Sequence, residues 1–416
     1  MRKLSVGLSL LALGLFSTSA FGQARKSANT RAPISVDSSY FQALGVTPKV
    51  TGHNRMSAEG NAATKQQPDR IVSLPNFSSS FTFDGQVFPF TMLGPSPRSH
   101  QTVRIPTTYV PMSFFFDEFV DANGNNIVID ATTITSEIKD SPNFENAEYS
   151  SGFTQFGDAV QRAEFFNLIN KDNDNDGDDS YHVLLDRPRT LTPVTIEVPV
   201  GSSVVFQLPD GSFFALIDIN FLSSQLNTLL QTEGLTVDSL PIFLTRNTVY
   251  GDFNAGQPVP GACCIGGFHT ALETNQVKNK IFVQVFDFAT SLDPDVADGV
   301  FGDPTIFSDV EALSHEISET MNDPFVNNVT PNYQIPGAPA GVCQAILETG
   351  DVIEDLQPAF FPVLLHGFTY HPQTEGLLQW FEGQKPSSAI DGAYSYPDPT
   401  KLTSPFTPCP PSPPSN

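Results

Sequence analysis

Basic residues are scarce in this chain of 416 residues. Lysine and arginine number 21 against 45 aspartates and glutamates, so the formal net charge is −24 at pH 7. Such a charge excludes nucleic acids and anionic membrane surfaces as partners, because both repel an acidic surface. It suits a protein that stays soluble outside the cell or that binds divalent cations.

Long apolar runs are missing beyond the N-terminus. A largely apolar stretch over residues 4–16 follows the basic residues Arg2 and Lys3, and small residues come after it. This order predicts a secretory signal peptide over residues 1–22, followed by a flexible leader over residues 23–70. No later stretch reaches the ~20 apolar residues of a membrane span, so no integral membrane segment is expected. The mature chain is predicted to be secreted or periplasmic.

Cysteine is rare, and its spacing is informative. The four cysteines are Cys263, Cys264, Cys343 and Cys409. Disulfide bonds are expected in an exported chain, and four cysteines leave three pairings open. A zinc site made of four cysteines is not expected, because two C-x-x-C pairs are absent. The proline-rich residues 401–416 predict a disordered tail. Cys409 in this tail either pins it or stays a free cysteine.

The pattern of apolar residues predicts the α+β class. A β-rich region over residues 71–210 precedes a zincin-like region over residues 211–400, in which a twisted sheet carries a metal-binding helix. Asp84-Gly85 between alternating apolar residues predicts a hairpin. Helices are expected at 158–166 and 221–230, and strands at 109–116, 194–200, 204–208, 241–250 and 280–288.

A further helix is predicted from Ser308 to Pro324. Ser308 and Glu311 have the spacing of a capping box, and Pro324 stops the helix. One side of this helix is apolar, through Val310, Leu313, Ile317 and Met321. The opposite side is polar. The alternative interpretation is an amphipathic surface helix with a solvated acidic face.

The polar side of this helix contains the sequence His-Glu-x-x-Glu over residues 315–319. His315 and Glu319 are four residues apart and therefore project from the same face. Imidazole and carboxylate are both zinc ligands, and Glu316 beside them is placed as a general base for a zinc-activated water. A glutamate stands where the common metallopeptidase motif has its second histidine.

A catalytic zinc needs a third protein ligand. Glu348 is the expected one, because it lies on a downstream segment and Asp351 follows where it could orient the first ligand. Asp323, another turn along the helix, is expected to brace the site. The remaining candidate ligands rank below Glu348, because a lone histidine in a loop is more often structural: His269, His366 and His371.

A second acidic segment resembles the start of a calcium loop. Asp172, Asp174 and Asp176 alternate ahead of Gly177, as in an EF-hand. Position twelve is Val183 rather than glutamate, so the full rule fails. Calcium bound at the three aspartates and a plain acidic surface loop both remain open.

Three segments in this order resemble the Exordium (phosphate-induced protein) family and related uncharacterised exported bacterial proteins. They are Ser314–Glu319, Asn322–Asn327 and Glu348–Asp351. The resemblance covers roughly residues 260–400. It implies a zincin-like helix with a downstream glutamate and aspartate, and it implies the site more directly than any reaction.

Two functions follow as expectations. The first is a secreted zinc-dependent hydrolase, metallopeptidase-like, that acts on a peptide or another extracellular polymer; the ligand pair, the base and the downstream glutamate favour it. The second is a non-catalytic extracellular or cell-surface protein with a structural or vestigial metal site. The missing second histidine favours the second.

Overall fold

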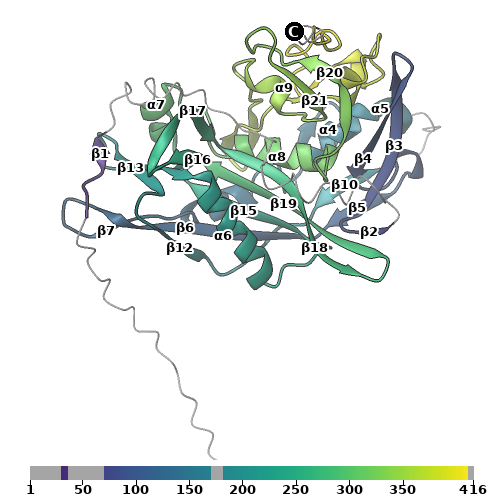
Figure 1. Cartoon of the computed structure of the whole chain (residues 1–416). Coiled ribbons are helices and arrows are strands. Elements are labelled where there is room, and N and C mark those ends of the chain that lie inside the picture. Colours follow the sequence, from purple (N-terminus) through teal and green to yellow (C-terminus); the bar gives the residue numbers. More distant parts are fainter. Residues whose placement is uncertain (1–29, 36–69, 170–180, 411–416) are drawn as a thin grey trace, which may run out of the picture.

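The structure is a computed structural model that describes residues 30–35, 70–169 and 181–410 (Figure 1). The predicted signal peptide at 1–22 and the predicted calcium loop at 172–176 lie outside the described residues. So do most of the predicted leader and the end of the predicted tail. The described part is a mixture of helices and strands, as the α+β prediction requires.

The larger sheet is curled around three long parallel strands, β6 (Thr107–Val120), β15 (Leu240–Arg246) and β19 (Lys280–Ser291). β15 lies between the other two and is almost entirely apolar and buried, as a strand covered on both faces must be. β18 (Gly267–Val277) runs antiparallel along β19. The other strands of this sheet pair with β6 or β19: β2 (Ile71–Val72), β7 (Asn126–Ile129), β11 (Arg189–Thr190) and β12 (Val194–Val198).

The smaller sheet has five strands in the order β1-β13-β14-β16-β17. The sequence predicts one strand over 241–250, but the chain makes two, because Asn247 adopts a left-handed backbone with φ of 48°. At this residue the chain passes from the larger sheet to the smaller one. The strands are β1 (Ile34–Ser35), β13 (Ser203–Gln207), β14 (Phe213–Asp218), β16 (Thr248–Asn254) and β17 (Gln257–Ile265).

Helix α6 (Ile219–Thr232) confirms the helix predicted at 221–230. Asp218 caps its first turn by accepting a hydrogen bond from the backbone N–H of Asn220. Leu222, Leu226 and Leu229 form its buried stripe. The three leucines pack with the apolar side chains of both sheets. Among the helices of the described ranges, none combines the length and hydropathy of a membrane span.

The predicted hairpin is confirmed as β3 (Asn76–Phe83) and β4 (Gln86–Leu93). Asp84 and Gly85 form its turn with φ of 48° and 77°, the two positive values that a two-residue hairpin turn of this kind requires. The helix predicted at 158–166 is α4 (Phe156–Glu164).

Shorter elements complete the N-terminal part: η2 (Pro97–Ser99), β5 (Thr102–Ile105), η3 (Thr132–Ile134), α3 (Thr135–Lys139), β8 (Ala147–Tyr149), β9 (Gly152–Thr154), α5 (Phe166–Ile169) and β10 (His182–Leu185). The C-terminal part adds α7 (Pro294–Phe301), β20 (Val329–Gln334), β21 (Cys343–Ile346), α9 (Asp351–Glu354), β22 (Val363–Leu365), β23 (Phe368–Tyr370), β24 (Glu375–Gly376), α10 (Leu378–Phe381), η4 (Ile390–Gly392) and β25 (Ser395–Tyr396).

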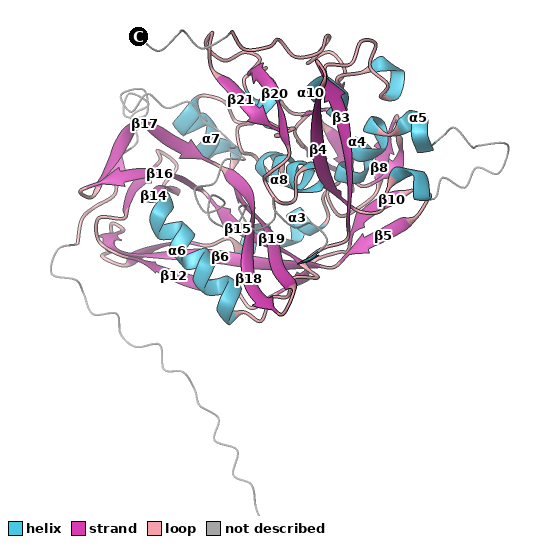
Figure 2. Cartoon of the chain, turned by 45° about the vertical axis from the view of Figure 1, so that its right-hand side comes forward, coloured by secondary structure: helices cyan, strands magenta, loops and turns pink. Residues whose placement is uncertain are grey.

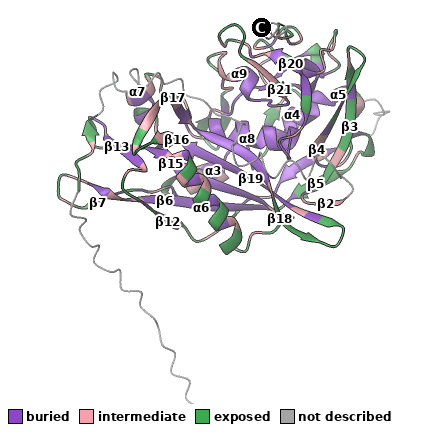
Figure 3. Ribbon diagram, in the orientation of Figure 1, coloured by how far each residue is buried: buried purple, intermediate pink, exposed green. Residues whose placement is uncertain are grey.

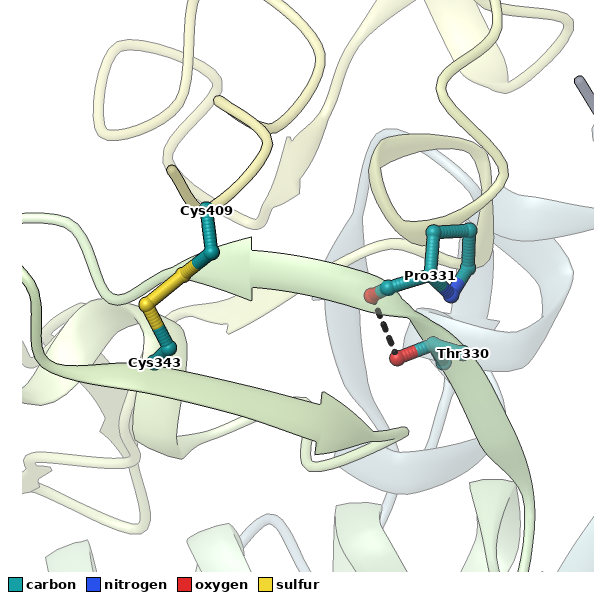
Figure 4. The surroundings of a disulfide bond; sticks show 4 residues. All are labelled: Thr330, Pro331, Cys343 and Cys409. Carbon is teal, nitrogen blue, oxygen red and sulfur yellow. Dashed lines mark hydrogen bonds between the residues drawn. A yellow bond between two sulfur atoms is a disulfide. The ribbon is translucent and has the colours of Figure 1, made fainter. Parts of the chain in front are cut away.

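Two disulfide bonds use all four cysteines. Cys263 bonds to its neighbour Cys264, and Cys343 at the start of β21 bonds to Cys409 (Figure 4). Where the sequence predicts a disordered tail, residues 401–410 instead pack against the protein. The Phe406 ring is buried there beside other aromatic rings, so Cys409 pins the tail.

Helix α8 (Glu311–Asn322) lies at the centre of the molecule. It packs against β18 and β19 of the larger sheet on one side and against α4 and β4 on the other (Figure 2). Figure 3 shows it as a buried element. This helix carries the His-Glu-x-x-Glu sequence.

Candidate metal centre

The start of α8 differs from the predicted capping box. Val310 is the N-cap residue, and no side chain caps the helix. The Glu311 carboxylate accepts a hydrogen bond from the backbone N–H of Phe307 instead of that of Ser308. The helix ends at Asn322, just ahead of Pro324, as predicted.

Every residue of α8 is buried. The predicted apolar stripe packs into the core through Leu313, Ile317 and Met321. The opposite, polar side is buried as well, so the alternative of a surface helix with a solvated acidic face is wrong. Burying imidazole and carboxylate groups costs free energy unless hydrogen bonds, opposite charges or a cation compensate for it.

His315 forms one group with Glu319 and Asp351. Its Nε2 lies 3.2 Å from Oε1 of Glu319 and 3.7 Å from Oδ1 of Asp351. Its Nδ1 lies 3.2 Å from Oε1 of Gln373, whose Nε2 donates to the Gly350 carbonyl. Since the Gln373 oxygen can only accept, Nδ1 carries a proton, and Nε2 is the ring atom that faces the carboxylates. Nε2 is therefore the atom through which His315 could bind a metal.

His269 forms a second group with Glu319 and Glu348. Its Nε2 lies 3.2 Å from the backbone oxygen of Asp323, which fixes the proton on that nitrogen. Its Nδ1 lies 3.3 Å from Oε2 of Glu319 and 3.5 Å from Oε2 of Glu316. Glu348 reaches the ring from the other side, with Oε2 3.9 Å from Nε2.

Several carboxylate oxygens of this cluster have no hydrogen-bond partner although they are fully buried. They are both oxygens of Glu316, both of Glu348, both of Glu375 and Oε2 of Glu319. A buried oxygen without a partner is costly, and a carboxylate without one is costlier still. We name His269, His315, Glu316, Glu319, Glu348, Asp351 and Glu375 the central cluster.

Burial raises the pKa of Glu316 to about 8. Burial and the neighbouring Glu319 raise the pKa of Glu348 well above its ordinary value. Glu319 differs: burial disfavours its ionised form, but His315 and His269 outweigh burial and lower its pKa well below the ordinary value. Burial therefore disfavours the ionised forms of Glu316 and Glu348, and a bound cation would favour them.

Two further aspartates lie next to the central cluster: Asp323, which the sequence indicated, and Asp287, which it did not. The Asp323 carboxylate accepts the backbone N–H groups of Asn327 and Asn328, and only its backbone oxygen faces His269. Asp287, on β19 opposite His269, accepts a hydrogen bond from the Thr320 hydroxyl. The Asp323 carboxylate is therefore engaged away from the cluster, whereas Oδ2 of Asp287 is buried without a hydrogen-bond partner.

The structure distributes the sequence-predicted ligands over the two groups. His315, Glu319 and Asp351 form one group, so Asp351 is itself a potential ligand. Glu348 belongs to the other group, with Glu319 and His269. Of the lower-ranked histidines, His269 belongs to the central cluster. The other two lie elsewhere: His371 pairs with Asp309 at 2.6 Å, and His366 lines a surface pocket.

The sequence did not indicate Gln373 or Glu375, since neither lies in a recognisable motif. His269 had a weak signal only, as a histidine just after the two cysteines. Its place in β18, where the chain returns to the larger sheet beside β19, makes it a core residue.

The centre is enclosed by the protein. The side chains of His269, His315, Glu316, Glu319 and Glu348 have no exposed surface. A surface pocket of about 780 Å³ opens elsewhere and is lined mainly by residues 144–148 and 361–366. None of its lining residues belongs to the central cluster. A substrate would therefore reach the cluster only after local opening.

The buried groups of the central cluster could hold a metal ion. Bonds of 2.0–2.2 Å to a tetrahedral ion place its ligand atoms about 3.3–3.6 Å apart, close to the 3.2–3.7 Å observed between the inward histidine nitrogens and the oxygens of Glu319 and Asp351. Imidazole with carboxylate suits zinc, iron or manganese.

No family model, curated protein or solved structure matches this chain.

Proposed function

We propose that this chain is an exported metal-dependent hydrolase, zincin-like and most similar in chemistry to a zinc metallopeptidase. The observation that carries the proposal is Glu316. It lies beside the ligand groups without belonging to either, and both its oxygens are free of hydrogen bonds inside the protein. The two disulfide bonds are compatible with export, because they persist in oxidising compartments.

The chemistry follows from what each group can do. A zinc ion held by the cluster would supply the positive charge that acidifies a water molecule and polarises a carbonyl. Glu316 would accept the water proton and then deliver it to the leaving group. Gln373 would hold the His315 ring with Nε2 directed at the cluster.

A second candidate function rests on burial. A cluster without exposed side chains is also typical of a structural metal site, whose ligands are closed to substrate. The protein would then be a non-catalytic extracellular or cell-surface protein that the metal stabilises. The position of Glu316 beside the ligand groups favours the hydrolase, and the enclosure of the cluster favours the structural role.

The Glu316→Gln variant tests the proposal. An amide cannot take up the proton, so zinc content should stay unchanged while cleavage of a broad peptide library falls at least ~10²-fold. Glu164→Gln is the matched control, because Glu164 is also fully buried with a pKa of about 8 but lies outside the cluster. Zinc-loaded wild-type protein that cleaves no peptide, with Glu316→Gln indistinguishable from it, would leave only the structural role.

A further inference from the structure

We propose that the central cluster is a two-ion centre in which the Glu319 carboxylate bridges a pair of divalent first-row transition ions. The inference rests on the proposed function for the identity of the site, but not on hydrolysis. Two groups of potential ligands are present, His315-Glu319-Asp351 and His269-Glu319-Glu348, and they share only Glu319. Each group offers one imidazole and two carboxylates.

The Glu319 carboxylate is oriented as a bridge. Its Oε1 lies 3.2 Å from Nε2 of His315, and its Oε2 lies 3.3 Å from Nδ1 of His269. The Gly350 backbone N–H donates to Oε1 at 3.0 Å and holds this orientation. A bridging carboxylate of this kind suits two ions about 3.5–4 Å apart.

Each histidine directs one ring nitrogen at a different oxygen of Glu319. The acceptor Gln373 Oε1 fixes the proton of His315 on Nδ1, and the Asp323 backbone oxygen fixes that of His269 on Nε2. The inward nitrogens, Nε2 of His315 and Nδ1 of His269, are buried and have no hydrogen-bond partner. Both rings therefore have an unused ligand atom directed at the cluster.

The test is ion stoichiometry combined with magnetic coupling. The full mature chain is loaded with Zn²⁺, passed over a desalting column and analysed for metal per chain. We expect two ions per chain in the wild type, one in His269→Ala, one in His315→Ala and none in Glu319→Ala. His371→Ala is the control and should keep two, because His371 lies outside the cluster. Circular dichroism confirms that each variant is folded.

A second measurement needs no variant. Loading with Mn²⁺ should give the exchange-coupled electron paramagnetic resonance spectrum of a close pair. One Zn²⁺ per chain with an isolated-ion Mn²⁺ spectrum would overturn the two-ion centre, whether or not the protein is a hydrolase. Two coupled ions without any peptide cleavage would support the centre and contradict the hydrolase.

Discussion

Gly350 lies directly against the imidazole ring of His315. A Cβ atom at Gly350 would come within 2.4 Å of Nδ1 and 2.5 Å of two ring carbons, closer than real contacts allow. The Gly350 backbone is in the ordinary helical region, with φ of −80°. Space rather than backbone conformation therefore demands glycine here.

Gly350→Ala should displace the His315 ring and cost about 1–3 kcal/mol of unfolding free energy, the usual range for overpacking a core. Zinc content should fall with it. The same substitution in a His315→Ala background should cost much less, because the ring is gone. Urea unfolding of the four proteins in this cycle measures the coupling. Equal costs in both backgrounds would contradict the contact.

Gly267 has the corresponding relationship with Glu316. A Cβ atom there would lie 2.7 Å from Oε1 of Glu316 and 3.0 Å from the Phe288 carbonyl oxygen. Gly267→Ala should therefore move the proposed base while leaving both ligand groups intact. We expect bound zinc to stay near the wild-type level and the rate of peptide cleavage to fall by at least tenfold. Loss of zinc from this variant would show that Glu316 and the ligands move together.

Glu164 predicts a pH dependence of stability that is separate from the central cluster. Burial raises its pKa to about 8, from 4.5 for an ordinary glutamate, although the Leu378 N–H opposes this. The unfolded chain therefore loses the proton first as pH rises. The free energy of unfolding should fall between about pH 4.5 and 8, by a few kcal/mol from this group.

Glu164→Gln should remove that part of the slope, because glutamine does not titrate and its oxygen can still accept from Leu378. Denaturant unfolding at several pH values between 5 and 8 measures it. The exposed Glu148→Gln is the control and should leave the slope unchanged. A Glu164→Gln protein with the wild-type slope would show that other groups cause the dependence.

The disulfide between Cys343 and Cys409 should contribute about 4 kcal/mol to the free energy of unfolding. This is the chain-entropy value for a loop closed over a sequence separation of 66. The double variant Cys343→Ser with Cys409→Ser should have an unfolding free energy lower by that amount, measured by urea unfolding. The Cys263→Ala and Cys264→Ala pair is the comparison. Those cysteines are neighbours and close only a two-residue ring, so the entropic loss should be small. Equal losses would contradict the loop argument.

Local chemistry made parts of the fold predictable. The Asp84-Gly85 turn depends on two residues that tolerate positive φ, and the apolar stripe of α8 depends on helical period alone. The break at Asn247 was not predictable, because an asparagine in an apolar run gives no sign that the chain changes sheets there. Likewise, the composition of the tail concealed the packing of Phe406.

The candidate site was likewise predictable only where it depends on local sequence. The spacing of His315 and Glu319 is a property of one helix, so the sequence indicates it directly. The partners of that helix come from distant segments: His269 from β18, Gln373 from a C-terminal loop. Whether a polar helix face meets water or other side chains depends on those tertiary contacts, which is why its burial could not be foreseen.

The burial of α8 has a consequence for the speed of metal exchange. Ligands without exposed surface cannot be attacked by a chelator while the fold is closed. Release of an ion would wait for the surrounding strands and the 348–375 segment to open. The release rate should therefore become independent of chelator concentration once chelator is in excess. The protein's own opening, rather than the strength of its metal bonds, would set how long an ion stays.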